Sequence, residues 1–442
     1  MYWIYSFLYG LALLISLPYW LIGMARAGKY RAGLMERFGA IAQRLELPKA
    51  GERSIWIHAV SVGEVLAVAG LVEGLKTEFP EKRLFVSTTT LTGQTLARRR
   101  FGEENVFYLP LDLPFAINRY LNAITPQILI LAETEFWPNL LRLTKKGEAQ
   151  VVVVNARISD RSLPGYRRFR SLLREVLRNL DLLLAQTELD RDRLIAIGAA
   201  GEKVLVGGNL KFDVKSPSES SLSRALRQSI APDQRVLVFG STVEGEEPLL
   251  VPCVKRVFSE LPQALIILAP RHPERFEEVA GLLQQLGIRF WKRSLWSGEP
   301  LSGGLLLVDT IGELASLYAL ADVAFVGGSL VPRGGHNILE PAQHGVPIIV
   351  GNHTENFRDV VTLFRSRDAV RIVGPAELPL VLLELLANDE ERNSLGRRAI
   401  ETVQSQKGAT EKTLHFLKDL LAENAQLPQA ESAGQTLPTR AG

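Results

Sequence analysis

Short apolar runs of strand length alternate with helical segments along nearly the whole chain, and this alternation constrains the fold more than any other feature. In the first half the expected strands are 54–60, 84–87, 105–109, 127–131, 151–154, 181–184 and 204–206. In the second half they are 236–239, 264–268, 305–308, 321–326 and 346–350. Strands that alternate with helices build a parallel sheet covered by helices on both faces. The sequence therefore predicts an α/β fold of doubly wound, Rossmann-like sheets.

The length of the chain points to two domains, because 442 residues exceed what one hydrophobic core usually holds. The stretch Lys-Ser-Pro-Ser-Glu-Ser-Ser (215–221) is polar and rich in residues that interrupt helices and strands. We therefore expect an N-terminal Rossmann-like domain at 54–210, a linker at 211–233 and a C-terminal Rossmann-like domain at 234–423. The polar segment 424–442 has little to bury and is expected to be disordered.

The N-terminal segment 1–24 carries no charged residue and is long enough to span a bilayer. Aromatic residues lie at both of its ends, as at membrane interfaces, and basic residues follow from Arg26 onward, which places the rest of the chain in the cytoplasm. A cleaved signal peptide would have the opposite polarity. We predict a membrane anchor at 1–24 and a basic juxtamembrane connector at 25–53. Because Pro18 can kink the helix, a helix that lies in the membrane interface remains an alternative.

Composition excludes several classes of protein. A formal charge of +3 is too small to indicate nucleic-acid binding, and the single cysteine, Cys253, excludes an internal disulfide. No phosphate-binding motif of an ATPase and no dinucleotide-binding Gly-x-Gly-x-x-Gly follows an expected strand. Asp190 and Asp192 have the spacing of metal-dependent sugar transferases but fall inside a helical pattern. The histidines lack the spacing typical of zinc ligands. We therefore predict no metal site.

A glycine-rich loop, Val-Gly-Gly-Ser-Leu-Val-Pro-Arg-Gly-Gly-His-Asn-Ile-Leu-Glu-Pro (326–341), joins one expected strand to a short helix at 338–344. Its glycines let the backbone approach a ligand, and amides at a helix start favour an anion such as a phosphate. Glu340 in the first helical turn has two oxygens suited to the hydroxyls of a ribose. A plain glycine turn, with Asn337 as N-cap and Glu340 closing a capping box, explains the same residues equally well.

Ligands of open parallel sheets bind beyond the carboxyl ends of the strands, so residues just after strands are candidates. Arg271, preceded by the turn-fixing Pro270, suits bidentate binding of a phosphate or carboxylate, although an exposed charge at a helix start explains it as well. Ser241 and Thr242 are either phosphate donors or helix caps, with caps favoured. The backbone near 311–312 is placed to contact a base edge.

The first domain also carries polar residues after strands. Glu64 follows a strand and a glycine turn, at a helix start that is expected to face the interdomain cleft. A carboxylate in this position suits a proton acceptor. Taken alone, however, the position is better explained by an acid that stabilises a helix N-terminus. Glu133 and Glu135 follow a hydrophobic strand, and paired acids so placed are hard to explain by packing. Lys211 is either a cation of the cleft or a surface lysine.

Five arginines are typical of a solvated face, or of contact with lipid phosphates beside a membrane anchor: Arg157, Arg161, Arg167, Arg168 and Arg170.

Taken together, five stretches closely resemble the 3-deoxy-D-manno-octulosonic acid (Kdo) transferases of lipopolysaccharide synthesis. They are His-Ala-Val-Ser-Val-Gly-Glu (58–64), Glu-Thr-Glu-Phe-Trp-Pro-Asn-Leu (133–140), Asn-Ala-Arg (155–157), Ala-Pro-Arg-His-Pro-Glu-Arg-Phe (269–276) and Phe-Val-Gly-Gly-Ser-Leu to Gly-Gly-His-Asn-Ile-Leu-Glu (325–340). The resemblance runs from the N-terminal segment through both domains in the same order. It implies a GT-B glycosyltransferase, in which two Rossmann-like domains face each other across a cleft.

The resemblance implies an inverting transfer of Kdo from CMP-Kdo to lipid IVA, the disaccharide precursor of lipid A, on the cytoplasmic side of the inner membrane and without a metal. Carried over by position, Glu64 is implied to be the proton acceptor, and Glu133 and Lys211 to stabilise the transition state. The implied CMP-binding residues are Pro270, Arg271, Ile311, Gly312, Glu313, Asn337, Ile338, Leu339 and Glu340. Ile338 replaces a proline common in the family, which we expect to change rigidity more than chemistry.

Two other classes of function stay open on the residues alone. A different GT-B enzyme that uses a UDP-sugar, either a transferase or an epimerase, would be stabilised by UDP but not by CMP. A membrane-tethered nucleotide-binding protein without catalysis is the other class, and the carboxylates Glu64, Glu133 and Glu135 argue against it.

Overall fold

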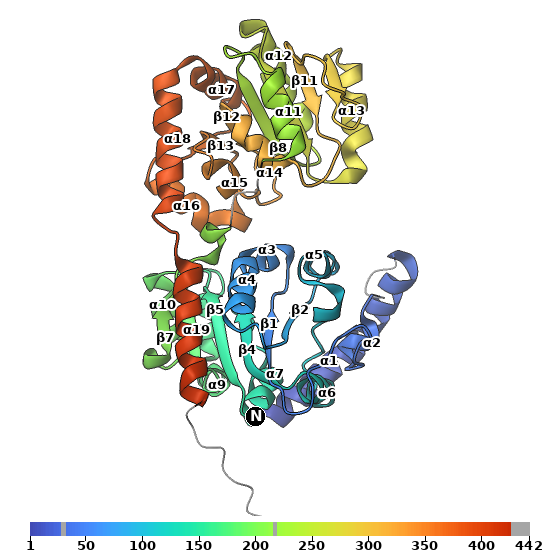
Figure 1. The fold of residues 1–442 in the computed structure, drawn as a ribbon, viewed down its shortest axis with the longest axis vertical. Helices are drawn as coiled ribbons and strands as arrows, with labels where there is room; N and C mark the ends of the chain where they lie inside the picture. The colour runs from blue at the N-terminus through green and yellow to red at the C-terminus, as the bar shows by residue number, and fades with distance from the viewer. Residues whose placement is uncertain (28–31, 215–218, 426–442) are drawn as a thin grey trace, which may run out of the picture. The chain divides into compact units, whose positions relative to one another are not determined.

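The computed structural model describes residues 1–27, 32–214 and 219–425, which fall into two compact units (Figure 1). The first unit comprises Met1–Val214 together with the chain from Gly408, and the second comprises Lys215–Lys407. Each unit has its own sheet of seven strands with helices packed against it, so the predicted pair of α/β sheets is confirmed.

The sheet of the first unit has the strand order β3-β2-β1-β4-β5-β6-β7, and its pairs are parallel. The strands are β1 (Ser54–His58), β2 (Leu84–Thr88), β3 (Val106–Tyr108), β4 (Pro126–Ala132), β5 (Gln150–Ala156), β6 (Leu182–Ala185) and β7 (Val204–Val206). Successive residues of β1 point to opposite faces: Ile55 and Ile57 pack in one core and Trp56 in the other. The strand order reverses between β1 and β4, which is where an open parallel sheet leaves room for a ligand.

The helices of the first unit are α1 (Tyr2–Ala27), α2 (Leu34–Arg37), α3 (Val62–Ala67), α4 (Ala69–Glu78), α5 (Leu91–Phe101), α6 (Pro114–Ile124), α7 (Pro138–Lys146), α8 (Leu163–Arg168), α9 (Arg170–Leu177), α10 (Glu188–Ala196) and α19 (Ala409–Ala425). Short 3-10 helices are η1 (Glu103–Asn105), η2 (Gly201–Lys203) and η3 (Leu210–Asp213). One helix was expected after β1; the structure has two, α3 and α4, which meet at Val68.

The first turns of α1 contact the domain through polar groups. The Tyr2 hydroxyl donates to the carbonyl oxygen of Glu175 (3.2 Å), and the Asn139 side chain donates to the Ser6 hydroxyl (2.9 Å). The Arg142 guanidinium lies 4.8 Å from the centre of the Tyr2 ring. None of the helices in the described parts of the chain combines the length and the apolarity needed to cross a membrane.

The C-terminal helix α19 packs on the first unit, whereas the sequence analysis placed the chain up to residue 423 in the second domain. Its buried Leu417 and Leu421 join the core that contains α4, and Asp213 accepts the N–H groups of Gly408 (2.8 Å) and Thr410 (2.5 Å). An apolar helical pattern shows that a helix forms but not which core it joins, so this assignment could not come from periodicity. The tail that was expected to be disordered lies almost wholly outside the described residues.

The sheet of the second unit has the strand order β10-β11-β9-β8-β12-β13-β14, again with parallel pairs. The strands are β8 (Val236–Thr242), β9 (Leu265–Pro270), β10 (Phe290–Lys292), β11 (Gly304–Leu307), β12 (Val323–Val326), β13 (Ile348–Val350) and β14 (Arg371–Ile372). The helices are α11 (Ser221–Ser229), α12 (Glu247–Glu260), α13 (Phe276–Gln285), α14 (Leu314–Leu317), α15 (Leu339–Ala342), α16 (Arg358–Ser366), α17 (Leu378–Ala387) and α18 (Asp389–Gln404), with η4 (Pro273–Arg275), η5 (Tyr318–Leu320) and η6 (Glu355–Phe357). Its strand order reverses between β8 and β12, and the glycine-rich loop follows β12.

Candidate functional site

Three carboxylates of the first unit lie after the adjacent strands β1 and β4. Glu64 is in the first turn of α3, shortly after β1, and Glu133 and Glu135 come directly after β4. Because β1 and β4 are parallel neighbours, these side chains share one edge of the sheet. The negative charges of Glu133 and Glu135 both raise the pKa of Glu64, so the three groups are close enough to interact.

Glu64 has the environment of a proton acceptor. Burial is the main reason that its pKa rises to about 7, and the neighbouring carboxylates raise it further against two hydrogen bonds. The N–H of Val60 donates to Oε2 (2.7 Å) and the Ser61 hydroxyl donates to Oε1 (2.9 Å). A carboxyl group with a pKa near 7 can take up a proton at neutral pH. Glu64 is also the acidic residue in the first turn of α3, so the interpretation as an acid that stabilises a helix N-terminus holds as well.

Glu133 is held between two cations and has an unusual backbone. Lys211 Nζ donates to its Oε1 at 3.0 Å, and Arg157 Nε lies 3.6 Å from its Oε2. Its φ is +58°, a conformation that residues other than glycine rarely adopt and that occurs often at functional sites. Glu135 accepts a hydrogen bond from Trp137 Nε1 (3.0 Å), and burial raises the pKa of Glu135. The predicted Lys211 is therefore a cation of this site and not a plain surface lysine.

Asn155 positions the segment that carries Lys211. Its φ is +56°, and its side-chain oxygen accepts the N–H of Leu210 (3.1 Å), the first residue of η3. On sequence alone, Asn155 was only part of a resemblance. A side chain that binds a backbone group 55 residues away leaves no periodic signal in the sequence.

The glycine-rich loop of the second unit is held by a carboxylate that the sequence analysis did not single out. Glu246 is fully buried and accepts the N–H groups of Gly328 (2.7 Å), Ser329 (2.9 Å) and Leu330 (2.9 Å). These loop amides are therefore bound to a side chain of the protein, whereas the amides at the helix start, for which a phosphate was predicted, lie further along the loop.

The glycine at 327 is explained by the same contact. A Cβ at this position would lie 2.6 Å from the carbonyl oxygen of Ser241 and 2.7 Å from Glu246 Oε2. The close approach that the sequence predicted at Gly327 is thus an approach of the protein's own strand β8 and of Glu246. The signal that could have identified Glu246 is its place shortly after β8, at the point where the strand order reverses.

Arg271, His336, Asn337 and Glu340 form a second polar group in this unit. Burial lowers the pKa of His336 to about 4, and the charge of Arg271 lowers it further. Burial raises the pKa of Glu340, against a hydrogen bond from Asn337 and the charge of Arg271. Asn337 donates to Glu340 Oε1 (3.3 Å) and accepts the N–H of Leu339 (3.1 Å). The N-cap of α15 is Ile338, so the predicted capping box with Asn337 as N-cap does not form. A guanidinium and a carboxylate are therefore brought together, as a nucleotide's phosphate and ribose require.

The other predicted CMP-binding residues are placed as follows. Pro270 is the last residue of β9, and the side chains of Ile338 and Leu339 are buried. Ile311 is 74% exposed and Gly312 has a φ of +90°. Glu313 accepts hydrogen bonds from Arg293 Nη2 (3.2 Å) and from the Thr310 hydroxyl, so its carboxylate is engaged within the unit.

Thr242 is neither a free phosphate donor nor a helix cap. It lies at the end of β8, and its hydroxyl donates to Glu247 Oε1 (2.9 Å), which also accepts from Arg275 Nη1 (2.6 Å). The capping interpretation, favoured for Thr242 on sequence, is wrong because β8 extends to this residue and α12 begins only at Glu247.

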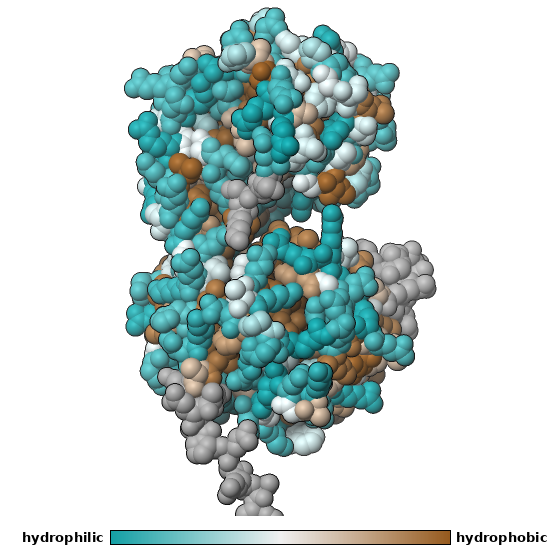
Figure 2. All heavy atoms as spheres, viewed as in Figure 1, coloured by the Kyte–Doolittle hydropathy of each residue, from teal (hydrophilic) through white to brown (hydrophobic). Residues whose placement is uncertain are grey.

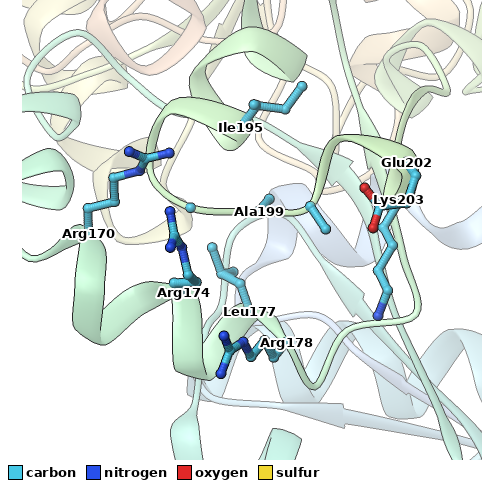
Figure 3. A pocket seen from close by; sticks show the side chains of 10 residues that line it. Arg170, Arg174, Leu177, Arg178, Ile195, Ala199, Glu202 and Lys203 are labelled. Atoms are coloured by element: carbon cyan, nitrogen blue, oxygen red, sulfur yellow. The ribbon is translucent and has the colours of Figure 1, made fainter.

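The predicted arginine face splits into two parts. Arg157 belongs to the carboxylate group described above, whereas Arg161, Arg167, Arg168 and Arg170 are exposed, as expected for a solvated face. Arg170 and Arg174 of α9 point toward a pocket of about 440 Å³ between α9 and the segment that contains Ala199 (Figure 3). Glu64, Glu133 and Lys211 do not line this pocket, and it is separate from the candidate site.

The two seven-stranded sheets define the class of the protein as a two-domain α/β protein with the GT-B fold. The crystal structure of UDP-GlcNAc 2-epimerase from Neisseria meningitidis bound to UDP-GlcNAc shares this fold, with a TM-score of 0.56 and 13% identity, and covers 83% of this chain and 100% of that chain. A family model described as 3-deoxy-D-manno-octulosonic-acid transferase (kdotransferase) matches residues 32–214.

Two relatives match almost from end to end. The 3-deoxy-D-manno-octulosonic acid transferase of Haemophilus influenzae is 35% identical over 430 residues, covering 95% of this chain and 100% of that protein. The 3-deoxy-D-manno-octulosonic acid transferase of Bordetella pertussis is 36% identical over 430 residues, covering 93% and 97%. The chain belongs to the 3-deoxy-D-manno-octulosonic acid transferase family and is a glycosyltransferase.

Proposed function

We propose that this protein transfers Kdo from CMP-Kdo to lipid IVA with inversion at the anomeric carbon. Membership of the Kdo transferase family supports the sugar and the reaction type. The observation that carries the proposal is Glu64, a carboxyl group with a pKa of about 7 at the carboxyl edge of a parallel sheet. We assign proton acceptance to the first unit and binding of the cytidine nucleotide to the second.

In the proposed step the acceptor hydroxyl attacks the anomeric carbon of Kdo while its proton passes to a carboxylate oxygen of Glu64. The bond between the anomeric carbon and the phosphate oxygen breaks, and its electron pair leaves with CMP. We assign to Arg271 the role of offsetting the negative charge that grows on the leaving phosphate, and to Glu340 that of accepting the ribose hydroxyls. Lys211 and Arg157 hold Glu133 in place, so that these charges are fixed before the reaction begins.

The test uses the full-length protein with CMP-Kdo and lipid IVA, followed by mass spectrometry of the lipid. We expect products heavier by whole Kdo residues and thermal stabilisation by CMP but not by UDP. Stabilisation by UDP alone, or unchanged lipid after incubation, would overturn the proposal in favour of an enzyme that uses a UDP-sugar.

We also propose that α1 holds the protein at the cytoplasmic face of the inner membrane. The support is the apolar surface of α1, where Trp3 is 89%, Phe7 70% and Ile15 72% exposed. We expect the protein to remain with the membrane fraction after a high-salt wash. A Trp3→Asp/Phe7→Asp variant that stays equally membrane-bound would contradict this assignment.

A further inference from the structure

An apolar groove opens on the first unit between α1 and the segment that joins β3 to α6. Leu14, Leu17 and Trp20 of α1 lie on one side and Leu113 and Phe115 on the other, around a cavity of about 450 Å³. Figure 2 shows apolar residues gathered in this region of the first unit, near α1 and α6. Among the described residues that line the groove, Arg37 alone carries a charge.

The groove leaves large apolar side chains in contact with water. Leu14 is 68% and Phe115 53% exposed, and they face the same cavity. Contiguous apolar surface of this kind is uncommon on a soluble face and marks a binding site for an apolar group.

The groove lies at the sheet edge that carries Glu64. Thr89 and Thr90 follow β2, and Leu113 and Phe115 follow β3, so both segments leave the sheet at the same carboxyl edge as the segment after β1. Arg37 donates to the carbonyl oxygen of Thr89. The hydroxyl of Thr90 donates to the carbonyl oxygen of Val60 (3.1 Å).

Val60 closes the connection, because its N–H donates to the Glu64 carboxylate (2.7 Å). Three consecutive contacts therefore lead from the charged rim of the groove to the candidate base. Arg37 is also stacked on the ring of Tyr108, with its guanidinium carbon 4.6 Å from the ring centre, so the rim is held in a fixed position.

We propose that this groove binds one acyl chain of the acceptor lipid, with Arg37 facing the polar headgroup. The inference rests on the proposed function, since it places the lipid tail of the acceptor whose hydroxyl Glu64 deprotonates. The single positive charge in the lining, Arg37, complements an anionic headgroup, whereas the other lining residues complement a hydrocarbon. An occupant with one charged end and a long apolar end matches this distribution of groups.

The groove acts differently on monomeric and on membrane-embedded acceptors. From water, each methylene that enters the groove strengthens binding about fourfold. From a bilayer the gain is small, because lipid tails are as apolar as the leucines of the groove. In a membrane, therefore, the groove fixes the position of the headgroup relative to Glu64 and adds little affinity.

The test measures transfer to water-soluble acceptors that differ only in acyl length, from none to ten carbons, each below its micellar concentration. For the wild-type protein we expect KM to fall about fourfold per added methylene until the groove is full, at constant kcat. Phe115→Asp should raise the KM of the ten-carbon acceptor at least tenfold and leave that of the deacylated acceptor unchanged. Phe169→Asp is the matched control, since Phe169 is 61% exposed in the same unit and does not line the groove.

A binding measurement separates this inference from the reaction itself. A monomeric decanoyl glucosamine phosphate with bromine atoms on its chain should quench the fluorescence of Trp20, identified as the signal lost in Trp20→Phe. If Phe115→Asp abolishes the quenching, the result supports the groove even when no Kdo is transferred. In that case only the proposed function fails. A KM independent of chain length, quenching unchanged in Phe115→Asp, or a Phe115-dependent dimer in light scattering would overturn the inference, whether or not transfer occurs.

Discussion

Replacing Glu64 by glutamine should reduce activity and should remove a loss of stability that the wild-type protein undergoes as pH rises. The reason is the pKa of about 7, since the ionised carboxylate is the form that accepts a proton. In the wild-type protein Glu64 is about one-tenth ionised at pH 6 and about nine-tenths ionised at pH 8. We therefore expect kcat/KM to rise about tenfold over this range with a midpoint near pH 7, whereas Glu64→Gln should be roughly 100-fold to 10,000-fold slower.

The effect on stability has the opposite sign. Burial raises the folded-state pKa of Glu64 above its ordinary value of 4.5, so the folded protein binds the proton more tightly than the unfolded chain. The contribution of Glu64 to stability is therefore complete below about pH 4.5 and is lost as pH rises through 7. A shift of about 2.5 pKa units corresponds to about 3 kcal/mol, of which about 2.5 kcal/mol should be lost between pH 5 and pH 8.

Glutamine does not ionise, so the variant should not undergo this loss. Urea unfolding at pH 5 and pH 8 should show the difference in unfolding free energy, variant minus wild type, increasing by about 2.5 kcal/mol at the higher pH. The comparison between the two pH values cancels the pH-independent cost of fitting an amide against the Val60 and Ser61 donors. Glu81→Gln is a suitable control, because Glu81 is exposed in the same unit. The same difference at both pH values would refute the argument from burial, and undiminished turnover would remove Glu64 as the base.

Three further substitutions test other parts of the site. Lys211→Met removes the 3.0 Å contact with Glu133 and should lower kcat about 100-fold, with the melting temperature reporting any loss of fold. Glu246→Gln places an amide N–H₂ against loop N–H groups and should destabilise the second unit by about 3 kcal/mol, seen as a lower thermal midpoint. Arg271→Ala should weaken CMP binding about tenfold to 100-fold in calorimetry. The thermal midpoint should not change, because Arg271 is exposed. Unchanged affinity would exclude Arg271 from the phosphate site.

Most strands could be predicted because they are buried on both faces and therefore read as continuous apolar runs. The two missed strands show the limit of this signal. β10 consists of Phe290, Trp291 and Lys292, all only half-buried, and β14 has two residues with the same partial burial. At the edges of a sheet a strand needs few apolar residues, so it forms by pairing with its neighbour and leaves little pattern.

The candidate site was predictable to the extent that it depends on strand ends. Glu64, Glu133 and Arg271 were identified because each follows an apolar run, and the resemblance added the roles. The contacts between distant segments could not be predicted: Glu133 and Lys211 are separated by 78 residues, and Glu246 and Gly328 by 82. The close approach at Gly327 shows the same limit, because glycine shows that something approaches the backbone but not whether it is a ligand or the protein's own carboxylate.

The C-terminal helix α19 helps to hold the segment that contacts the strained residues of the first unit. Glu133 and Asn155 both have positive φ, which costs of order 1–3 kcal/mol each and persists only where the surroundings impose it. Asn155 binds the N–H of Leu210 at the start of η3, and Asp213 at its end accepts the N–H groups of Gly408 and Thr410 at the start of α19. η3 is thus held at both ends, and Lys211 between them meets Glu133 at 3.0 Å. Because α19 supplies one of these supports, the geometry of the Lys211–Glu133 pair depends on a helix that follows it by about 200 residues.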